Sequence, residues 1–271
     1  MQHDEMSFWD HLEELRWTLF RSILSLVLFA IAFFVFMRGE NGIFNAFILG
    51  PTRGDFLTYQ LLCKIGSSFS LLSEFCDTAF RIEIMNIKLA TQFFTHMTTS
   101  FWLALVCAFP YLMFEVWRFI SPALYENEKK SVRWVFLFGT VMFFIGCAVG
   151  YFMVFPMTLR FLATYQISEV IKEQVSLDSS MDNFLMLIFI MGIIFEMPLL
   201  SWLLSKLGLL HRGFFARYRR HAVVVLLILA ALITPSGDPF TLSIVFIPLY
   251  ALFELSACFV KPAPKEEDDG D

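Results

Sequence analysis

Glu196 is a carboxylate within an apolar stretch, Phe184–Leu204, that is long enough to cross a lipid bilayer. Because an ionisable side chain is costly inside a membrane, a residue at this position is a candidate functional group by default. Its carboxylate can accept hydrogen bonds or pair with a cation, and Pro198 favours a bend that frees backbone carbonyls. A hydrogen bond to a neighbouring helix is the structural alternative for the same residue.

Carboxylates also gather on the segment from 7 to 16, SFWDHLEELR, just before the first apolar stretch. Ser7 followed by Asp10 resembles a capping box, and apolar residues recur on one helical face. The segment therefore predicts an amphipathic helix at the membrane surface, from which Glu13 and Glu14 project on other faces. A helix start favoured by acidic residues at its positive end is the structural alternative.

The segment from 114 to 133, FEVWRFISPALYENEKKSVR, combines aromatic, basic and acidic side chains. Ser121 followed by Pro122 predicts a helix start, with an N-cap residue and then a proline in the first position. An ordered loop of this composition indicates a binding surface. Anchoring of Trp117 among lipid headgroups is the structural alternative.

The composition requires that lipid cover part of this chain. Hydrophobic residues make up 58% of its 271 residues and charged residues only 17%, with 34 phenylalanines and a mean hydropathy of +0.67. Soluble domains contain about 45–50% apolar and about 25% charged residues. The net charge of −5 is small, and its distribution gives no reason to expect nucleic-acid binding.

The predicted fold class is an all-α membrane protein with six transmembrane helices. Lys and Arg concentrate in the loops after spans two and four, which places both termini in the cytoplasm. The apolar core of span five is only about 18 Å long, so helices five and six are expected to be short. The expected spans are Trp17–Met37, Ile87–Met113, Trp134–Phe155, Phe184–Leu204, Ala222–Ile233 and Phe240–Val260.

A single membrane domain, residues 1–260, is expected to precede a disordered acidic tail, residues 261–271. The segment before the first apolar stretch is acidic and no small-residue cleavage site follows, so this stretch predicts a retained helix. The first exported loop, residues 38–86, is long and contains Cys63 and Cys76. The two cysteines could pair in an oxidising compartment, but their spacing alone does not decide this.

Six short motifs occur along the chain in a fixed order. They are HLEELR at 11–16, FISPALYENE at 119–128, GYFMVFP at 150–156, FEMP at 195–198, LITP at 232–235 and IPLYALFE at 247–254. The ordered set resembles the TatC family, the multi-spanning receptor subunit of the twin-arginine protein translocase, over nearly the whole chain. The chain departs from the family in its longer first exported loop, mainly around residues 61–81.

The resemblance implies that Glu14 and Glu128 bind the paired arginines of a signal peptide, with Arg16 and Phe119 at neighbouring positions of the site. Carboxylates suit this role because the guanidinium fork of arginine can donate two parallel hydrogen bonds, a geometry that lysine cannot reproduce. Arg16 is expected to position the loop, and Phe119 is expected to pack against apolar atoms of the peptide.

The resemblance also implies a membrane-facing groove in which Glu196, Asp238 and Thr241 contact partner subunits or cargo. Thr241 is included because family members often have a glutamine at the start of helix six. A turn-forming role explains Asp238 equally well, and Glu254 is expected to be an interfacial structural group. Structural roles are assigned to five prolines, Pro51, Pro122, Pro156, Pro198 and Pro235.

The partners implied by the resemblance are single-span proteins of the TatA and TatB types, twin-arginine signal peptides on folded cargo, the lipid bilayer and further copies of this chain. Export would use the proton-motive force, so no cofactor, metal or catalytic residue is expected. The location implied is the bacterial inner membrane.

Two other functions fit less of the sequence. An intramembrane hydrolase would need a nucleophile with its base or paired metal ligands, and the five histidines form no HExxH pair. An aspartyl dyad is not supported either, because only Glu196 lies deep in a predicted span. A secondary transporter often shows an inverted repeat with paired broken helices, and no repeat is visible.

Overall fold

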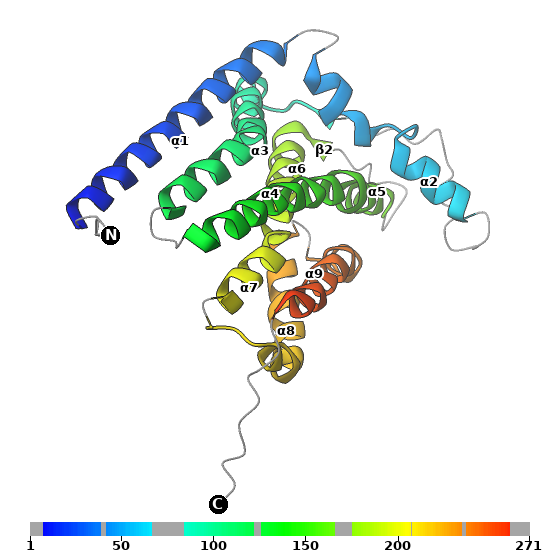
Figure 1. The fold of residues 1–271 in the computed structure, drawn as a ribbon. Coiled ribbons are helices and arrows are strands. Elements are labelled where there is room, and N and C mark those ends of the chain that lie inside the picture. The colour runs from blue at the N-terminus through cyan, green and yellow to red at the C-terminus, as the bar shows by residue number, and fades with distance from the viewer. Residues whose placement is uncertain are drawn as a thin grey trace, which may run out of the picture. The chain divides into compact units, whose positions relative to one another are not determined.

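A computed structural model describes residues 8–38, 42–66, 84–121, 126–165, 175–206, 208–234 and 237–260. The chain forms two compact units (Figure 1). Unit 1 comprises Met1–Val141 with Gln166–Phe189, and unit 2 comprises Met142–Tyr165 with Ile190–Asp271. The predicted acidic tail, residues 261–271, lies outside the described residues.

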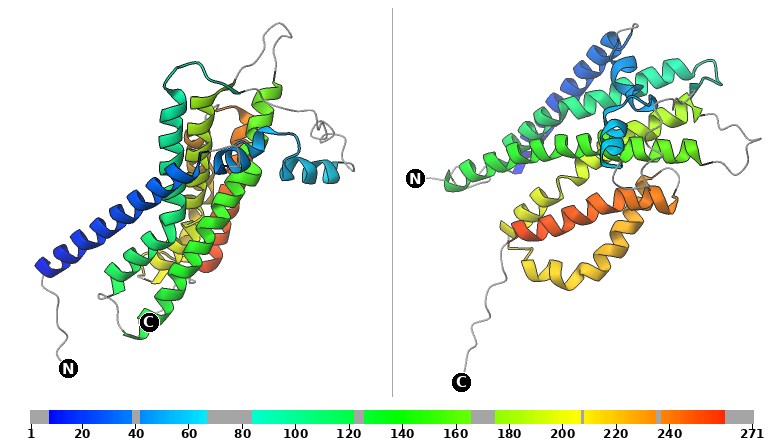
Figure 2. Two further views of the ribbon diagram at one scale, coloured as in Figure 1. Left: turned by 90° about the horizontal axis from the view of Figure 1, so that it is seen from above. Right: turned by 90° about the vertical axis from the view of Figure 1, so that its right-hand side faces the viewer.

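Unit 1 is built on two long antiparallel helices, α1 (Phe8–Phe36) and α3 (Thr91–Ile120), which pack along each other (Figure 2). Small side chains such as Ala104 and Ala108 are fully buried on α3, which allows a close approach. α1 keeps most of its apolar side chains exposed over Leu12–Phe36, as lipid contact requires. The predicted amphipathic segment is the first part of this continuous helix.

The loop between α1 and α3 contains short elements of its own. They are the π-helix η1 (Phe44–Ile48), the 3-10 helix η2 (Gly50–Thr52), α2 (Leu57–Gly66) and β1 (Ile84–Met85). Strand β1 pairs in parallel with β2 (Val175–Ser176). Cys63 on α2 is disulfide-bonded, and Cys76, which the sequence left open as a partner, lies outside the described residues.

Helix α3 is longer than predicted. It continues to Ile120, seven residues beyond the predicted end at Met113, although Pro110 lies inside it. Ser121 is the C-cap of α3, and its backbone N–H donates to the carbonyl of Trp117. The predicted helix start at Ser121 and Pro122 depends on residues 122–125, which lie outside the described residues. Helix α4 (Glu126–Val149) follows, so the predicted cytoplasmic loop is helical at both ends.

In unit 2 the third span continues past the predicted stop at Pro156. The last residues of α4 lead through the π-helix η5 (Gly150–Val154) into α5 (Phe155–Thr164). Pro156 lies inside this continuous helical run and comes just after η5, whose wider π-helical turn accommodates a residue without an N–H. The apolar stretch therefore extends over Trp134–Thr164.

The fourth span is broken at Glu196. α6 (Leu177–Ile194) ends there and α7 (Met197–Lys206) begins after two turn residues, within the apolar stretch Met181–Lys206. This break agrees with the bend predicted from Pro198.

The last two helices are α8 (Arg212–Ile233) and α9 (Pro239–Phe259). At 22 and 21 residues they are shorter than α1 and α3, with 29 and 30 residues, and α8 begins ten residues before the predicted start at Ala222. Within the described residues, five helical stretches are long and apolar enough to cross a membrane. The sixth span is α8, whose first half is basic and whose second half is apolar.

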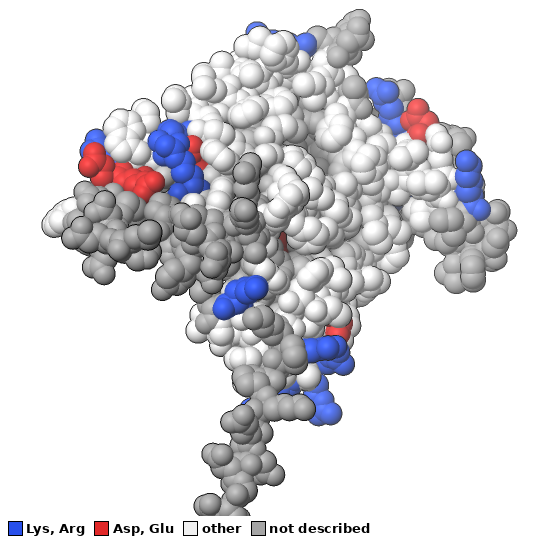
Figure 3. Space-filling model, in the orientation of Figure 1, with Lys and Arg blue, Asp and Glu red and all other residues white. Residues whose placement is uncertain are grey.

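Charged side chains are sparse on the surface of the described residues. Figure 3 shows them in small groups, separated by broad areas that carry neither acidic nor basic side chains. Such a surface suits lipid contact, because hydrocarbon solvates apolar side chains and not charges.

Candidate functional site

Glu196 is buried and its carboxylate is unpaired. Only 4% of the residue is exposed, and neither carboxylate oxygen has a hydrogen-bond partner among the described residues. Its backbone is satisfied: the N–H donates to the carbonyl of Ile193 at 3.0 Å, and the carbonyl accepts from the N–H of Leu200 at 3.0 Å. The side chain therefore has its full hydrogen-bonding capacity available inside an apolar segment.

Gly146 on α4 and Gly192 on α6 allow these two helices to pack closely beside Glu196. A Cβ atom added at Gly146 would lie 2.6 Å from the carbonyl oxygen of Met191 and 2.8 Å from Cβ of Phe195. One added at Gly192 would lie 2.6 Å from Cε2 of Phe143. Because Phe195 directly precedes Glu196, this close packing fixes the turn that holds the carboxylate.

Asp238 caps helix α9. Its Oδ1 accepts hydrogen bonds from the backbone N–H groups of Phe240 at 3.0 Å and Thr241 at 2.9 Å, and its Oδ2 accepts from the Thr241 hydroxyl. Thr241 is fully buried. The structure therefore gives both residues a capping role, and their contact with partners or cargo stays a prediction.

Glu254 joins α8 to α9, as expected of a structural group. Its Oε2 accepts from Nη2 of Arg219 at 2.7 Å, and its Oε1 accepts from the Tyr250 hydroxyl at 3.1 Å. Both partners of the ion pair are partly exposed, so the pair adds little stability.

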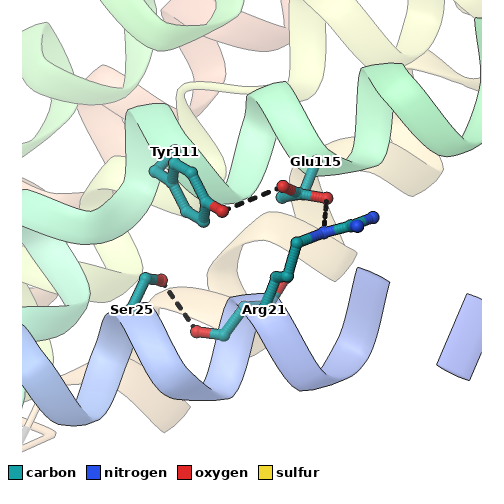
Figure 4. Close-up of polar contacts among 5 residues, drawn as sticks. Arg21, Ser25, Tyr111 and Glu115 are labelled. Atoms are coloured by element: carbon teal, nitrogen blue, oxygen red, sulfur yellow. Dashed lines mark hydrogen bonds and ion pairs between the residues drawn. The ribbon is translucent and has the colours of Figure 1, made fainter. Parts of the chain in front are cut away.

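A second buried carboxylate, Glu115 on α3, was not predicted. Its Oε2 accepts from Nε of Arg21 on α1 at 3.1 Å, and its Oε1 accepts from the hydroxyl of Tyr111 at 2.9 Å (Figure 4). Glu115 is 1% exposed, so this pair lies largely outside water. Glu196 is therefore not the single buried carboxylate among the described residues, because α3 extends past Met113 and includes Glu115.

The residues predicted to bind a signal peptide lie beyond this ion pair. Because α1 and α3 are antiparallel, Glu14 on α1 and Phe119 on α3 both lie toward the same end of the helix pair. Seven helical residues separate Glu14 from Arg21, about 10 Å, and four separate Phe119 from Glu115, about 6 Å. Glu14 and Phe119 are partly exposed.

Arg16, also on α1, is exposed. Glu128 is part of helix α4, but its side chain lies outside the described residues. The structure therefore brings Glu14, Arg16 and Phe119 toward one end of the pair formed by α1 and α3.

The predicted structural prolines divide into described and undescribed residues. Pro51 is buried in η2, and its carbonyl accepts from the Tyr59 hydroxyl at 3.1 Å. Pro156 and Pro198 are buried in the first turns of α5 and α7. Pro122 and Pro235 lie outside the described residues.

Metal binding has no candidate in the part of the chain that the structure describes, where no three His, Cys, Asp or Glu side chains form a group that could hold an ion.

Comparison with known proteins gives one consistent result. The family described as "Sec-independent protein translocase protein (TatC)" matches residues 10–248. The protein of that name from Blattabacterium sp. subsp. Periplaneta americana is 36% identical over 256 residues, covering 94% of this chain and 95% of the relative. The one from Deinococcus radiodurans is 32% identical over 267 residues, covering 96% and 88%.

A solved structure gives the same result. The "Crystal Structure of Twin Arginine Translocase Receptor- TatC" is similar with a TM-score of 0.66 and 26% sequence identity, covering 92% of this chain and 97% of that chain.

Proposed function

Because this chain belongs to the TatC family of Sec-independent protein translocases, we propose that its cytoplasmic face binds the two arginines of a twin-arginine signal peptide through Glu14 and Glu128. The chain is an inner-membrane component of the twin-arginine translocase and acts in the export of folded proteins. Arg16 positions the site, and Phe119 packs against apolar atoms of the peptide.

The observation that best supports this proposal is the antiparallel helix pair closed by Arg21 and Glu115. It holds Glu14 and Phe119 toward one end, so an acidic group and an aromatic group face the same peptide. A guanidinium binds a carboxylate through two parallel hydrogen bonds, and this geometry gives a preference for arginine over lysine.

The test is crosslinking of a signal peptide to the full chain in membranes, with Arg-Arg and Lys-Lys versions of the peptide. We expect strong crosslinks to the Arg-Arg peptide alone, and their loss in Glu14→Ala and in Glu128→Ala. Glu13→Ala is the matched control, because Glu13 is the exposed carboxylate next to Glu14. Equal crosslinking of both peptides in all four proteins would contradict the proposal.

Glu196 is proposed to accept a hydrogen bond from a polar group of a partner subunit of the TatA or TatB type, or of the passing cargo. Support comes from its two unpaired, buried carboxylate oxygens. Site-specific crosslinks between residues near Glu196 and TatB-type partners should weaken in Glu196→Ala. They should persist in Glu254→Ala, because Glu254 is already paired within the chain.

The chain is further proposed to assemble with copies of itself and to act without a catalytic step, with the proton-motive force as the energy source. The apolar half of α8 is short relative to the bilayer core of about 30 Å. Local thinning of the bilayer around it would ease the passage of folded cargo. Insertion of several leucines into α8 should then reduce export, and unchanged export would count against the thinning.

A further inference from the structure

A pocket of about 300 Å³ opens in unit 1 at the exported end of α1 and α3. This end lies opposite the one that carries Glu14 and Phe119, so the pocket is separate from the proposed signal-peptide site. Its lining comes from the end of α1, from η1, from the first turns of α3 and from the start of α6. The lining residues are Met37, Arg38, Phe44, Asn45, Gln92, Thr95, His96 and Leu177.

Two of the nitrogen-bearing side chains of the pocket are held by a single aromatic ring. The imidazole of His96 stacks on Phe34, with ring centroids 4.1 Å apart and an angle of 16° between the planes. Cζ of Arg38 lies 5.7 Å from the centroid of the same Phe34 ring. The guanidinium and the imidazole are therefore both positioned by packing within α1 and α3.

His96 also has an unused polar atom. Its Nε2 is buried and has no hydrogen-bond partner among the described residues. A buried polar atom without a partner is costly, and a ligand or a water molecule can remove that cost. Because the other ring nitrogen donates to the backbone carbonyl of Phe34, Nε2 carries a proton and can donate to a ligand when the imidazole is cationic.

The pocket suits an anion with several oxygen atoms. Its lining contains a guanidinium, an imidazole, two side-chain amides and a hydroxyl, all of which can donate hydrogen bonds, and none of its eight residues is acidic. Arginine is well suited to bind phosphate oxygens. The apolar walls formed by Met37, Phe44 and Leu177 can cover the carbon atoms of a phosphate ester.

We infer that this pocket binds a phosphate group. Two sources share this chemistry, the headgroup of an anionic phospholipid in the outer leaflet and free inorganic phosphate. A lipid would enter with its phosphate against Arg38 and His96 and its glycerol against the apolar walls. Inorganic phosphate would use the same donors without the apolar contacts.

The first test is native mass spectrometry of the full chain in detergent, titrated with phosphatidylglycerol and, in parallel, with phosphatidylcholine. We expect one phosphatidylglycerol to bind in preference to phosphatidylcholine, and its apparent affinity to fall at least tenfold in Arg38→Gln/His96→Gln. Arg53→Gln is the matched control: Arg53 is an exposed arginine of the same exported loop and does not line the pocket. Its affinity should equal that of the wild type.

Two additions distinguish the possible outcomes. Gln92→Leu removes one amide and leaves the Phe34 stack in place, so reduced binding in this variant cannot be ascribed to a collapsed His96. Inorganic phosphate added as a competitor separates the two sources. Displacement of the lipid at millimolar phosphate would identify the free anion as the ligand of the pocket, and retention of the lipid would identify the lipid as the ligand. No preference for phosphatidylglycerol, or equal binding by the wild type and both pocket variants, would overturn the inference.

Discussion

Glu115 in unit 1 and Glu196 in unit 2 are both buried carboxylates, Glu115 within helix α3 and Glu196 in the turn between α6 and α7, and they differ in their partners. Glu115 accepts from a guanidinium and from a phenol, so its charge is matched within the chain. Glu196 accepts from neither side chain nor backbone among the described residues. The contacts of Glu115 join two helices of this chain. The carboxylate oxygens of Glu196 can still accept hydrogen bonds from a partner subunit or from cargo.

The difference shows why burial alone does not identify a functional residue. A carboxylate with internal partners is expected to stabilise the fold when present and to destabilise it when removed. One without partners is expected to cost stability, and its retention is then explained by binding. The two residues should therefore respond in opposite directions to substitution.

The largest expected effect is that of Glu115→Ala. The substitution leaves the Arg21 guanidinium and the Tyr111 hydroxyl without their acceptor, which should cost about 3 kcal/mol, the lower end for a buried pair because Arg21 is partly exposed. Thermal unfolding in detergent measures this cost. Arg21→Ala/Glu115→Ala removes both charges and should recover part of the loss; an undiminished loss would contradict the pairing.

The next effect is expected at the glycines that hold the Glu196 turn. Gly192→Ala forces its Cβ against Phe143 and Cys147 and should destabilise the protein by about 1–3 kcal/mol through overpacking. Gly213→Ala is the matched control, because no atom lies within 4 Å of its added Cβ. Unfolding curves that shift equally for both variants would show that the close approach is unimportant.

A smaller effect is expected at the cap of α9. Asp238→Ala removes the acceptor for two backbone N–H groups, Phe240 and Thr241, and should cost about 1 kcal/mol. Asp238→Asn keeps a capping oxygen and should cost less. If both variants unfold like the wild type but export fails in both, Asp238 acts through a partner and not through the helix.

The smallest effect on stability is expected for Glu196→Gln. The amide keeps the shape of the side chain and cannot ionise, so the melting temperature should stay the same or rise, while export and partner crosslinks fall. Glu115→Gln is the matched variant and should lower the melting temperature. Destabilisation of similar size in the two glutamine variants would remove the distinction between the residues.

The sequence was sufficient to predict the helical membrane fold, the six spans and an acidic residue, Glu196, within the fourth span, because hydropathy and an ionisable residue inside an apolar stretch are local signals. The functional role of Glu196 stays a prediction. It did not predict the partnership of Glu115, which depends on where α3 ends. Apolar content falls near Met113, but helical hydrogen bonding continues to Ile120. Arg21, a cation within the first apolar stretch, could have indicated the pair, because a charged residue inside a membrane span usually has a partner of opposite charge.

The predicted end of the third span failed for a local reason. Pro156 has the residue type of a helix stop, but it comes just after the π-helix η5, so the helical structure continues into α5. Ser121 completes α3, and the predicted helix start after it falls on residues 122–125, outside the described residues.

The pairing of Arg21 with Glu115 also constrains the order in which the protein is made. The two residues are 94 positions apart, so at about 5–20 residues per second Arg21 is synthesised about 5–20 s before Glu115. During that interval the first helix must lie in the membrane with an unpaired cation, whose long side chain can extend to the headgroups. Once α3 has been synthesised and inserted, Glu115 can pair with Arg21 inside the protein. The first helix therefore reaches its final position in the membrane only at this later stage of synthesis.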